Sequence, residues 1–141
     1  MSIHQDIQSG IAELLRADEE LSAAGCTVIE QNGPELAAEI QKELGSLDGP
    51  VLVVCVDEVR LQTTHPRQYE VDVSIDVTEV VVHNRERGGF LTAIDCAMRA
   101  GEIADGLFGN FRSVSHSTPG GGVLEAVAKI TGKFQTVEQG G

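Results

Sequence analysis

Tryptophan is absent from this sequence, and the remaining aromatic residues are one tyrosine and four phenylalanines. A buried core must therefore be aliphatic, built from Val, Ile, Leu and Ala. No apolar run approaches the roughly 20 residues with which a helix crosses a bilayer. The opening residues, MSIHQDIQSG, lack the basic segment and the continuous apolar stretch of a signal peptide. We therefore expect a cytoplasmic protein without membrane contact.

Positive charge is also scarce. Lys and Arg number 10 against 22 Asp and Glu, which gives a formal net charge of -12 at pH 7. Such a chain repels a phosphate backbone unless its few basic residues are concentrated in one place. Sequence-specific binding of nucleic acid is therefore not expected.

Cysteine occurs only three times, at positions 26, 55 and 96. The number is odd, the spacing is wide, and each cysteine lies in an apolar segment, which favours reduced, packed thiols over a disulfide framework or a zinc site. We expect all three to be free and at least two to be shielded from solvent. A nucleophilic cysteine would need a histidine partner, and the sequence leaves a distant one open.

The 141 residues fit a single domain, 1–141, which is large enough to bury a core without disulfides or metals. Apolar periodicity predicts helices at 3–22, 34–44 and 90–108, strands at 26–30, 50–59, 68–83 and 123–137, and a flexible loop at 113–122. The order α-β-α-β-β-α-β predicts an α+β domain in which helices pack on one face of a mainly antiparallel, four-stranded sheet.

Alternation is most regular in QYEVDVSIDVTEVVVH, residues 68–83. One face carries Tyr69, Val71, Val73, Ile75 and Val77, and the other carries Glu70, Asp72, Ser74, Asp76 and Thr78. The acids on the second face are open to three interpretations: a divalent-metal site, the solvated side of a sheet, or the wall of a channel.

This strand is also unusually long. About fifteen residues exceed the usual five or six of a strand. Val80, Val81 and Val82 are consecutive, so the alternation slips near Glu79 and predicts a bulge there. Either the strand bends sharply, or its end leaves the domain to contact something else.

The helix at 90–108 contains apolar residues at helical spacing. We expect its inner stripe to consist of Phe90, Ile94, Ala97, Met98, Gly101, Ala104 and Leu107 or Phe108.

A metal or acid/base site on the acidic strand would need ligands from other elements, and Asp57 and Glu58 could supply them across the hairpin. The histidines are scattered, and PGGGV lacks the pattern of a phosphate-binding loop. We therefore expect no catalytic residue, no metal and no cofactor.

Half of the basic residues are arginines that fall in predicted loops: Arg60, Arg67, Arg85, Arg87 and Arg112. In an acidic chain they are available to pair with acids on another surface. Plain solubilising arginines are the alternative.

Several elements follow one another in a characteristic order: an amphipathic helix, a central apolar strand (PVLVVCVDEV), a long strand (YEVDVSIDV) that ends in an arginine-containing turn (NRERGG), an alanine-rich helix (FLTAIDCAMRAGEIADGLF) and a closing strand. In this order and texture the sequence resembles the tail terminator and tail completion proteins of tailed phages and prophages, including the Mu-type minor tail proteins. The resemblance covers nearly the whole chain and rests on element order, since no invariant motif anchors it. The helix at 34–44 is a departure from the simplest terminators.

The resemblance implies a structural function without enzymatic activity. Subunits of this family close into a ring, usually a hexamer, which caps the tail tube at its final length and meets the head–tail connector. Assembly in the host cytoplasm, a final place in the virion tail, and DNA that passes through without sequence-specific binding are implied as well. Glu70, Asp72 and Asp76 would then be candidates for a channel-facing wall, because an acidic wall repels phosphates.

A head-to-tail interface needs apolar surface and complementary charge. The end of the long strand and the neighbouring loops offer both, so we expect the subunit or partner interface at Arg60, Arg67, Val80, Val82, Arg85 and Arg87.

Two other classes of function stay open. A small cytosolic metal-dependent enzyme would use the acidic strand face together with Asp57. A binding module unrelated to phages would explain the same fold without a ring.

Overall fold

The computed structural model describes residues 3–30, 49–61, 68–80, 91–120 and 122–135. The described helices are α1 (Ile3–Ala17), α2 (Glu19–Ala23) and α5 (Ala93–Phe108), and the strands are β1 (Thr27–Glu30), β2 (Val51–Leu61), β3 (Gln68–Val80), β4 (Gly109–Gly120) and β5 (Val123–Gln135). The predicted helix at 34–44 lies outside the described residues.

The strands form one sheet in the order β1-β2-β3-β5-β4, which makes β1 and β4 the two edges. β1 runs parallel to β2, and every other neighbouring pair is antiparallel. The mixed α+β class and the mainly antiparallel sheet are therefore confirmed. The prediction of four strands is wrong, because the sheet has five.

The fifth strand, β4, occupies the segment that was predicted to be a flexible loop. Its sequence, GNFRSVSHSTPG, is polar, but an edge strand needs an apolar neighbour on one side only. Val114 lies opposite the buried Ala128 of β5, and Gly120 and Gly122 adopt positive φ at the hairpin turn. The physical cause is thus the partner strand, which the local sequence does not reveal.

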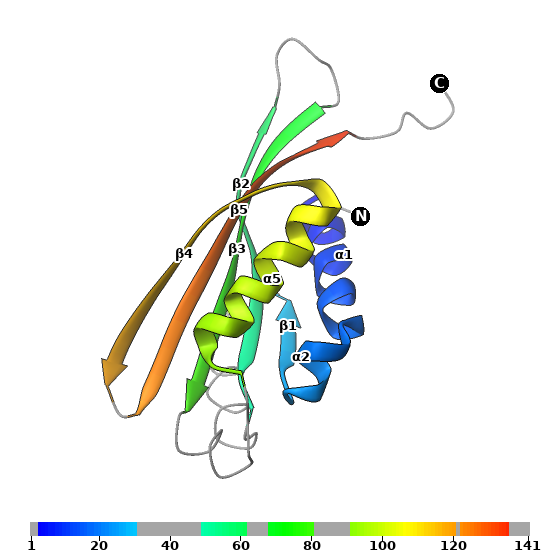
Figure 1. The fold of residues 1–141 in the computed structure, drawn as a ribbon. Coiled ribbons are helices and arrows are strands. Elements are labelled where there is room, and N and C mark those ends of the chain that lie inside the picture. The colour runs from blue at the N-terminus through cyan, green and yellow to red at the C-terminus, as the bar shows by residue number, and fades with distance from the viewer. Residues whose placement is uncertain (1–2, 31–48, 62–67, 81–90, 121, 136–141) are drawn as a thin grey trace.

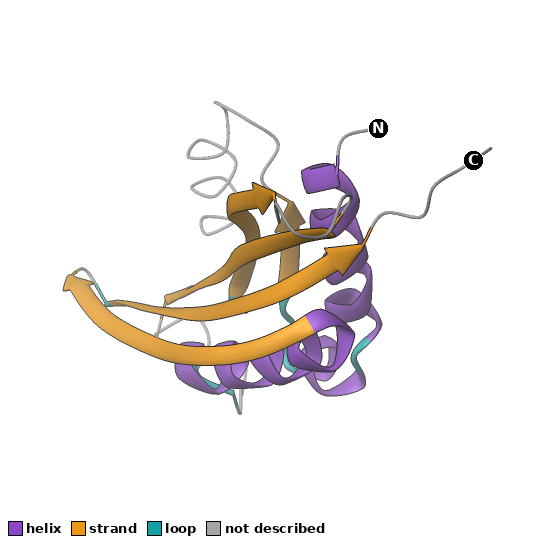
Figure 2. Cartoon of the chain, turned by 90° about the horizontal axis from the view of Figure 1, so that it is seen from above, coloured by secondary structure: helices purple, strands orange, loops and turns teal. Residues whose placement is uncertain are grey.

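The helices form a second layer on one face of the sheet (Figures 1 and 2). α1 lies over β1 and β2, whereas α5 lies over β3, β5 and β4. Between the layers is an aliphatic core, which contains Ile7, Ile11 and Leu15 of α1, Val71, Val73, Ile75 and Val77 of β3, and Ala126, Ala128 and Ile130 of β5. The expected composition of the core is confirmed.

The first helix is shorter than predicted, because Asp18 interrupts it. Asp18 has extended backbone dihedrals, and its carboxylate accepts a hydrogen bond from the backbone N–H of Leu21 at 3.1 Å. This is the geometry of an N-cap, so a second helix, α2, begins at Glu19.

β3 stays in the sheet over all of its described residues, so a departure from the domain stays a prediction for the end of the strand. It pairs with β5 from Gln68 opposite Gln135 to Val80 opposite Val123. The alternation does not slip at Glu79 either, since Glu79 lies on the core side with Val77. The register shift next to β3 lies in β2, where Asp57 is the extra residue. Residues 81–83 lie outside the described part of the chain.

Glu79 is a buried acid, with only 2% of its surface exposed. Its carboxylate accepts a hydrogen bond of 2.8 Å from the backbone N–H of Ala93, the first residue of α5. Thr92 and Asp95 add a capping box at the same terminus. A buried carboxylate therefore fixes the start of α5 to the end of β3, where the helix dipole favours negative charge.

The buried face of α5 consists of small residues and matches the predicted stripe only in part. Ala97, Gly101 and Ala104 are buried as predicted, together with Ala93, Cys96 and Ala100, whereas Ile94, Met98 and Leu107 are exposed. Phe90 lies outside the described residues. The Phe111 ring lies directly against Gly101, so that a Cβ there would be only 2.5 Å from a ring carbon. Small side chains let the helix approach the sheet closely, and the larger apolar residues are placed outside.

Among the described residues, no helix has the length and apolar character needed to span a membrane.

Candidate functional site

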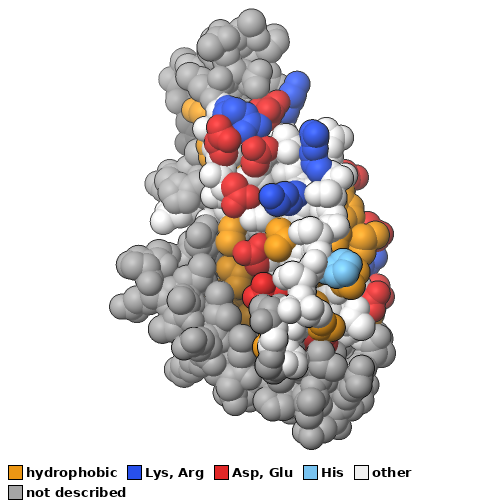
Figure 3. Space-filling view, turned by 90° about the vertical axis from the view of Figure 1, so that its left-hand side faces the viewer, with side chains coloured by type: hydrophobic (Ala, Val, Ile, Leu, Met, Phe, Trp, Pro, Cys, Tyr) orange, Lys and Arg blue, Asp and Glu red, His pale blue; other side chains and the backbone are white. Residues whose placement is uncertain are grey.

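The sheet face opposite the described helices combines an apolar and a polar region. Val51, Val53 and Cys55 of β2 form a separate buried cluster with Ile29 on this face. Towards the other end of the face, acidic and basic side chains interleave (Figure 3). Here the surface hollows into a groove of about 810 Å³, which we call the polar groove; its lining comprises Asp57, Arg60, Glu70, Asp72, Ser74, Asp76, Arg112, Ser113, Ser115, Val127, Lys129 and Thr131.

Arg60 is the centre of the charge network in the polar groove. It lies in β2, directly opposite Glu70, and not in a loop as predicted. Its guanidinium donates hydrogen bonds to Glu70 and, at 2.6 Å, to Asp72, and it forms an ion pair of 3.0 Å with Glu58. Glu70 and Asp72 of the strand face therefore pair with an arginine of their own subunit.

Asp72 has its negative charge stabilised by three neighbours. The hydrogen bond from Arg60 holds the pKa of Asp72 below its ordinary value, and the Thr131 hydroxyl adds a hydrogen bond of 2.8 Å. Arg112, at the register shift of β4, contributes a further favourable charge. These contacts occupy the carboxylate that the sequence offered as a metal ligand.

Asp76, four residues further along the same face, is in the opposite situation. Burial raises the pKa of Asp76, and the negative charges of Asp57 and Glu125 raise it further, while Lys129 opposes them. The Ser74 hydroxyl donates a hydrogen bond of 3.0 Å to Asp57. Asp72 and Asp76 thus lie on the same strand face, but their pKa values are shifted in opposite directions.

The polar groove is close to charge balance, because four carboxylates and three cationic side chains line it. Within the part of the chain that the structure describes, no group of three or more His, Cys, Asp or Glu side chains is arranged to hold a metal ion. Acidic side chains do face away from the helices, as the channel and solvation interpretations both require. Each of these two interpretations stays a prediction.

The helix layer carries a second candidate surface, which the sequence reasoning assigned to the core. Ile94 and Met98 of α5 are exposed to 37% and 43%, and Leu107 to 44%. We call Ile94 and Met98 the α5 patch. The available signal was the run of Ala, Cys and Gly at the spacing of one helical face, which indicates a close helix–sheet contact and displaces larger residues outward.

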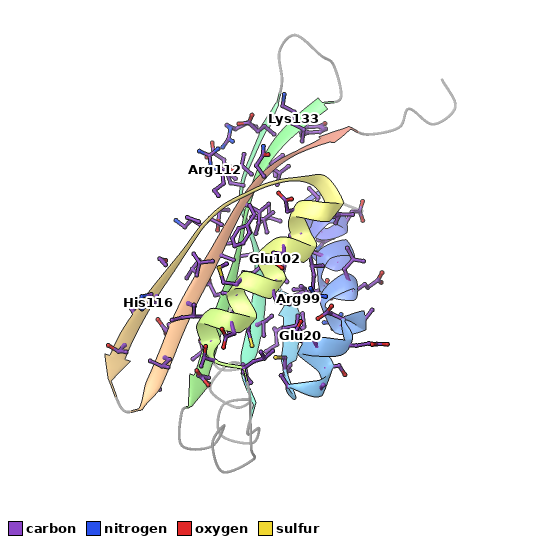
Figure 4. All side chains as sticks on the ribbon, in the orientation of Figure 1. Glu20, Arg99, Glu102, Arg112, His116 and Lys133 are labelled. Carbon is purple, nitrogen blue, oxygen red and sulfur yellow. The ribbon has the colours of Figure 1, made fainter. Side chains whose placement is uncertain are left out.

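A further apolar side chain of this layer is exposed on the first helix. Leu14 of α1 is 40% exposed, and α1 lies over β1 and β2, whereas α5 lies over β3, β5 and β4 (Figure 1). Arg99 of α5 forms ion pairs with Asp18 at 2.7 Å and Glu20 at 3.5 Å, where the helices meet (Figure 4). Both α1 and α5 therefore carry exposed apolar residues.

The two edges differ in charge. β4 contains Arg112 and His116 and no acidic residue, although the chain has 22. On the opposite side, α1 and α2 with their capping residue contain Asp6, Glu13, Asp18, Glu19 and Glu20. Asp18 is engaged with Arg99, but Glu13 and Glu19 are exposed.

The predicted interface residues fall into three groups. Arg60 is engaged within its own subunit. Val80 ends β3 opposite Val123, and nothing is described of its side chain. Arg67, Val82, Arg85 and Arg87 lie outside the described residues. An interface at these positions stays a prediction.

The cysteines are free, as predicted, with Cys55 and Cys96 buried and Cys26 half-buried. Burial raises the pKa of the Cys55 thiol to about 12, and the nearby Asp76 and Asp57 charges act in the same direction. The close approach of Cys26 and Cys96 was not predicted from the sequence.

Known families and relatives give no further assignment: no protein-family model matches the chain, and no curated protein matches it.

Proposed function

We propose that this protein is a ring-forming structural subunit of the tail-terminator type. The observation that carries the proposal is the outward placement of large apolar residues on a helix whose buried face is built from small ones. A monomer gains nothing from exposing Ile94 and Met98, whereas a subunit that packs against another copy buries them.

The location of the apolar residues favours a head-to-tail contact. The α5 patch belongs to α5, which packs over β3, β5 and β4, and Leu14 belongs to α1, which packs over β1 and β2, so the two surfaces are different. A contact between two different surfaces is heterologous, and it closes into a ring when the rotation between subunits permits. In our proposal the α5 patch of one subunit packs against the α1 side of the next.

Charge supports the same pairing. The β4 edge is free of acids and carries Arg112 and His116, whereas the α1–α2 side exposes Glu13 and Glu19. In a chain of net charge -12, two copies repel one another over most orientations. The approach of the β4 edge to the α1–α2 side is the one that reduces this repulsion.

The polar groove has a passive function in this proposal. Its carboxylates are largely balanced by Arg60, Arg112 and Lys129, so the face neither attracts nor strongly repels phosphates. Such a surface suits the boundary of a channel through which DNA moves without being held. The chain is then a structural protein, not an enzyme, and its partners are the tail tube and the head–tail connector, joined in the host cytoplasm and retained in the virion tail.

Light scattering coupled to size-exclusion chromatography tests the ring. Between about 10 µM and 1 mM protein, the mass should rise to one closed oligomer, and electron microscopy should show rings. Ile94→Asp combined with Met98→Asp should lower the association constant at least tenfold, because it places two charges in the contact. Circular dichroism verifies that the variant remains folded.

Leu107→Asp is the matched control, because it places a charge on an exposed apolar position of the same helix outside the α5 patch. It should assemble as the wild type does. A strict monomer at 1 mM that also fails to bind a tail-tube protein would remove the ring proposal. A mass that saturates at a dimer would replace the head-to-tail contact by a two-fold one.

A further inference from the structure

Cys26 and Cys96 are separated by 70 positions in the sequence, yet their sulfur atoms lie 3.6 Å apart. Cys26 follows Gly25, which has φ of 75°, immediately before β1, and Cys96 lies near the start of α5. The two residues therefore meet where the first strand passes beneath the helix layer.

This distance is a non-bonded contact of two thiols, about 1.5 Å longer than a disulfide bond. Both side chains already point at one another, because one sulfur hydrogen-bonds the other. Cys26 lies next to a turn, where a small displacement meets less resistance than in a helix or a paired strand. We propose that Cys26 and Cys96 are an oxidisable pair that closes to an intramolecular disulfide in the folded protein.

The reaction needs a two-electron oxidant, and a peroxide serves as the chemical class. Cys26 is the more accessible sulfur, so its thiolate attacks the peroxide oxygen and becomes a sulfenic acid, while the other oxygen leaves as water. The Cys96 sulfur then attacks the Cys26 sulfur, and its proton leaves with the sulfenic oxygen as a second water molecule. Two thiols and one hydrogen peroxide thus give one disulfide and two waters.

The environment assigns the order of the two thiols. The hydrogen bond with Cys26 and burial both raise the pKa of Cys96, and the charges of Glu79 and Asp95 add to this. Cys96 is therefore suited to the second step, in which it attacks the adjacent Cys26 sulfur and does not need to meet an oxidant from solution. Oxidation of Cys26 alone stops at the sulfenic acid, which Cys96 can then attack to form the disulfide.

The disulfide would connect the turn before β1 to α5, in addition to the ion pair that already joins Arg99 of α5 to Asp18 at the start of α2. Closing a loop of this length restricts the unfolded chain, so the oxidised form should be the more stable one. This inference does not rest on the proposed function, since it depends only on the contact within one subunit.

Cys55 is the matched internal control. It is buried on the other face of the sheet with Val51 and Val53, and its sulfur hydrogen-bonds the Val53 carbonyl oxygen at 3.9 Å. Burial protects Cys55 from the oxidant, and the raised pKa of its thiol lowers its reactivity.

The test treats the native full chain with hydrogen peroxide and counts thiols after denaturation. The count should fall from three to one, the mass should fall by about 2 Da, and a peptide map should join Cys26 to Cys96. Oxidation should raise the melting temperature by about 5–15 °C, and dithiothreitol should reverse the change.

Cys26→Ser and Cys55→Ser separate the outcomes. Cys26→Ser replaces a half-buried residue, should fold normally, and should form no intramolecular disulfide; Cys55→Ser should oxidise as the wild type does. The inference is overturned if wild-type protein keeps three thiols while a small exposed thiol in the same solution is consumed. It is equally overturned if the disulfide forms only between chains, or if it joins Cys55.

Discussion

Asp72 and Asp76 should respond to the same substitution with opposite signs. Both lie on one face of β3, and replacement by Asn removes one negative charge while keeping the side-chain shape. At about pH 7 we expect Asp72→Asn to destabilise the fold and Asp76→Asn to stabilise it.

The magnitude for Asp72 follows from its contacts. Loss of its charge weakens the two charge-assisted hydrogen bonds from Arg60, but Arg60 keeps Glu70 and Glu58, and the Asn carbonyl can still accept from Thr131. A charged hydrogen bond contributes about 1.5–3 kcal/mol when well shielded, and the side chain is 32% exposed. After this discount for solvent screening, Asp72→Asn should lower the free energy of unfolding by about 1 kcal/mol.

The gain at Asp76 comes from removing a poorly solvated charge. Burial penalises its charged form, and Asp57 and Glu125 repel it, while Lys129 returns part of the loss. Asp76→Asn should raise the free energy of unfolding by about 0.5–1 kcal/mol. The stabilities of the two variants should therefore differ by about 1.5–2 kcal/mol, although the two positions are only four residues apart on one strand.

The pH dependence gives each effect its sign. The pKa of Asp72 is lowered from 3.8, so its stabilisation is complete above 3.8 and is lost as the pH falls through the folded-state pKa. The pKa of Asp76 is raised from 3.8, so the fold gains from its protonated form below 3.8, and this gain is lost as the pH rises through the folded-state pKa. Both differences from wild type should shrink towards about pH 3.

Urea unfolding, followed by circular dichroism in steps from about pH 7 to pH 3, measures these differences. The reasoning fails if both variants change stability in the same direction at about pH 7. It also fails if either difference keeps its full size in acid, because an effect of shape alone does not titrate.

Two further pairs of substitutions test the packing of α5. Glu79→Leu should lower the free energy of unfolding in urea by about 2–3 kcal/mol, because it leaves the buried Ala93 N–H without its acceptor. Glu79→Gln keeps an acceptor oxygen and should cost about half as much. Equal losses in the two variants would contradict a role of this hydrogen bond. Gly101→Ala should cost about 1–3 kcal/mol because its Cβ meets the Phe111 ring, while Gly106→Ala, with open space at its Cβ, should gain about 0.5–1 kcal/mol from helix propensity; a gain at both positions would show that the ring moves aside freely.

The strands that the sequence predicted well are those whose own apolar residues follow a recognisable pattern along the chain. β3 and β5 bury alternate apolar residues against the helices, so the period of two is visible in their amino acids alone, whereas β2 is recognisable as a short apolar run, Val51–Cys55, that is buried on both faces. β4 was missed because its residues are polar and its strand conformation depends on pairing with β5. The strand conformation of such an edge strand can be predicted only when its pairing with the neighbouring strand is known.

The candidate sites were harder to predict, because they depend on which residues lie opposite each other. Arg60 follows a bulge at Asp57, and this register brings it opposite Glu70. Without the bulge, the register of β2 after Asp57 would shift by one residue, and Arg60 would then point to the opposite face of the sheet, away from the acids. Similarly, helical periodicity is compatible with two orientations of α5, one that buries Ile94 and one that buries Ala93. Which of them occurs depends on how closely α5 approaches the sheet.

Gly109 and Gly132 face each other where β4 begins beside the end of β5. A Cβ on Gly109 would lie 2.3 Å from the Cα of Gly132 and 2.6 Å from the Thr131 carbonyl oxygen. At this point the chain leaves α5 and turns directly into the curved hairpin of Figure 2. Gly109 cannot be exchanged while the two backbones stay in contact, so relatives that retain the curved hairpin should retain glycine at this position. A side chain there would push β4 away from β5 and alter the breadth of the subunit.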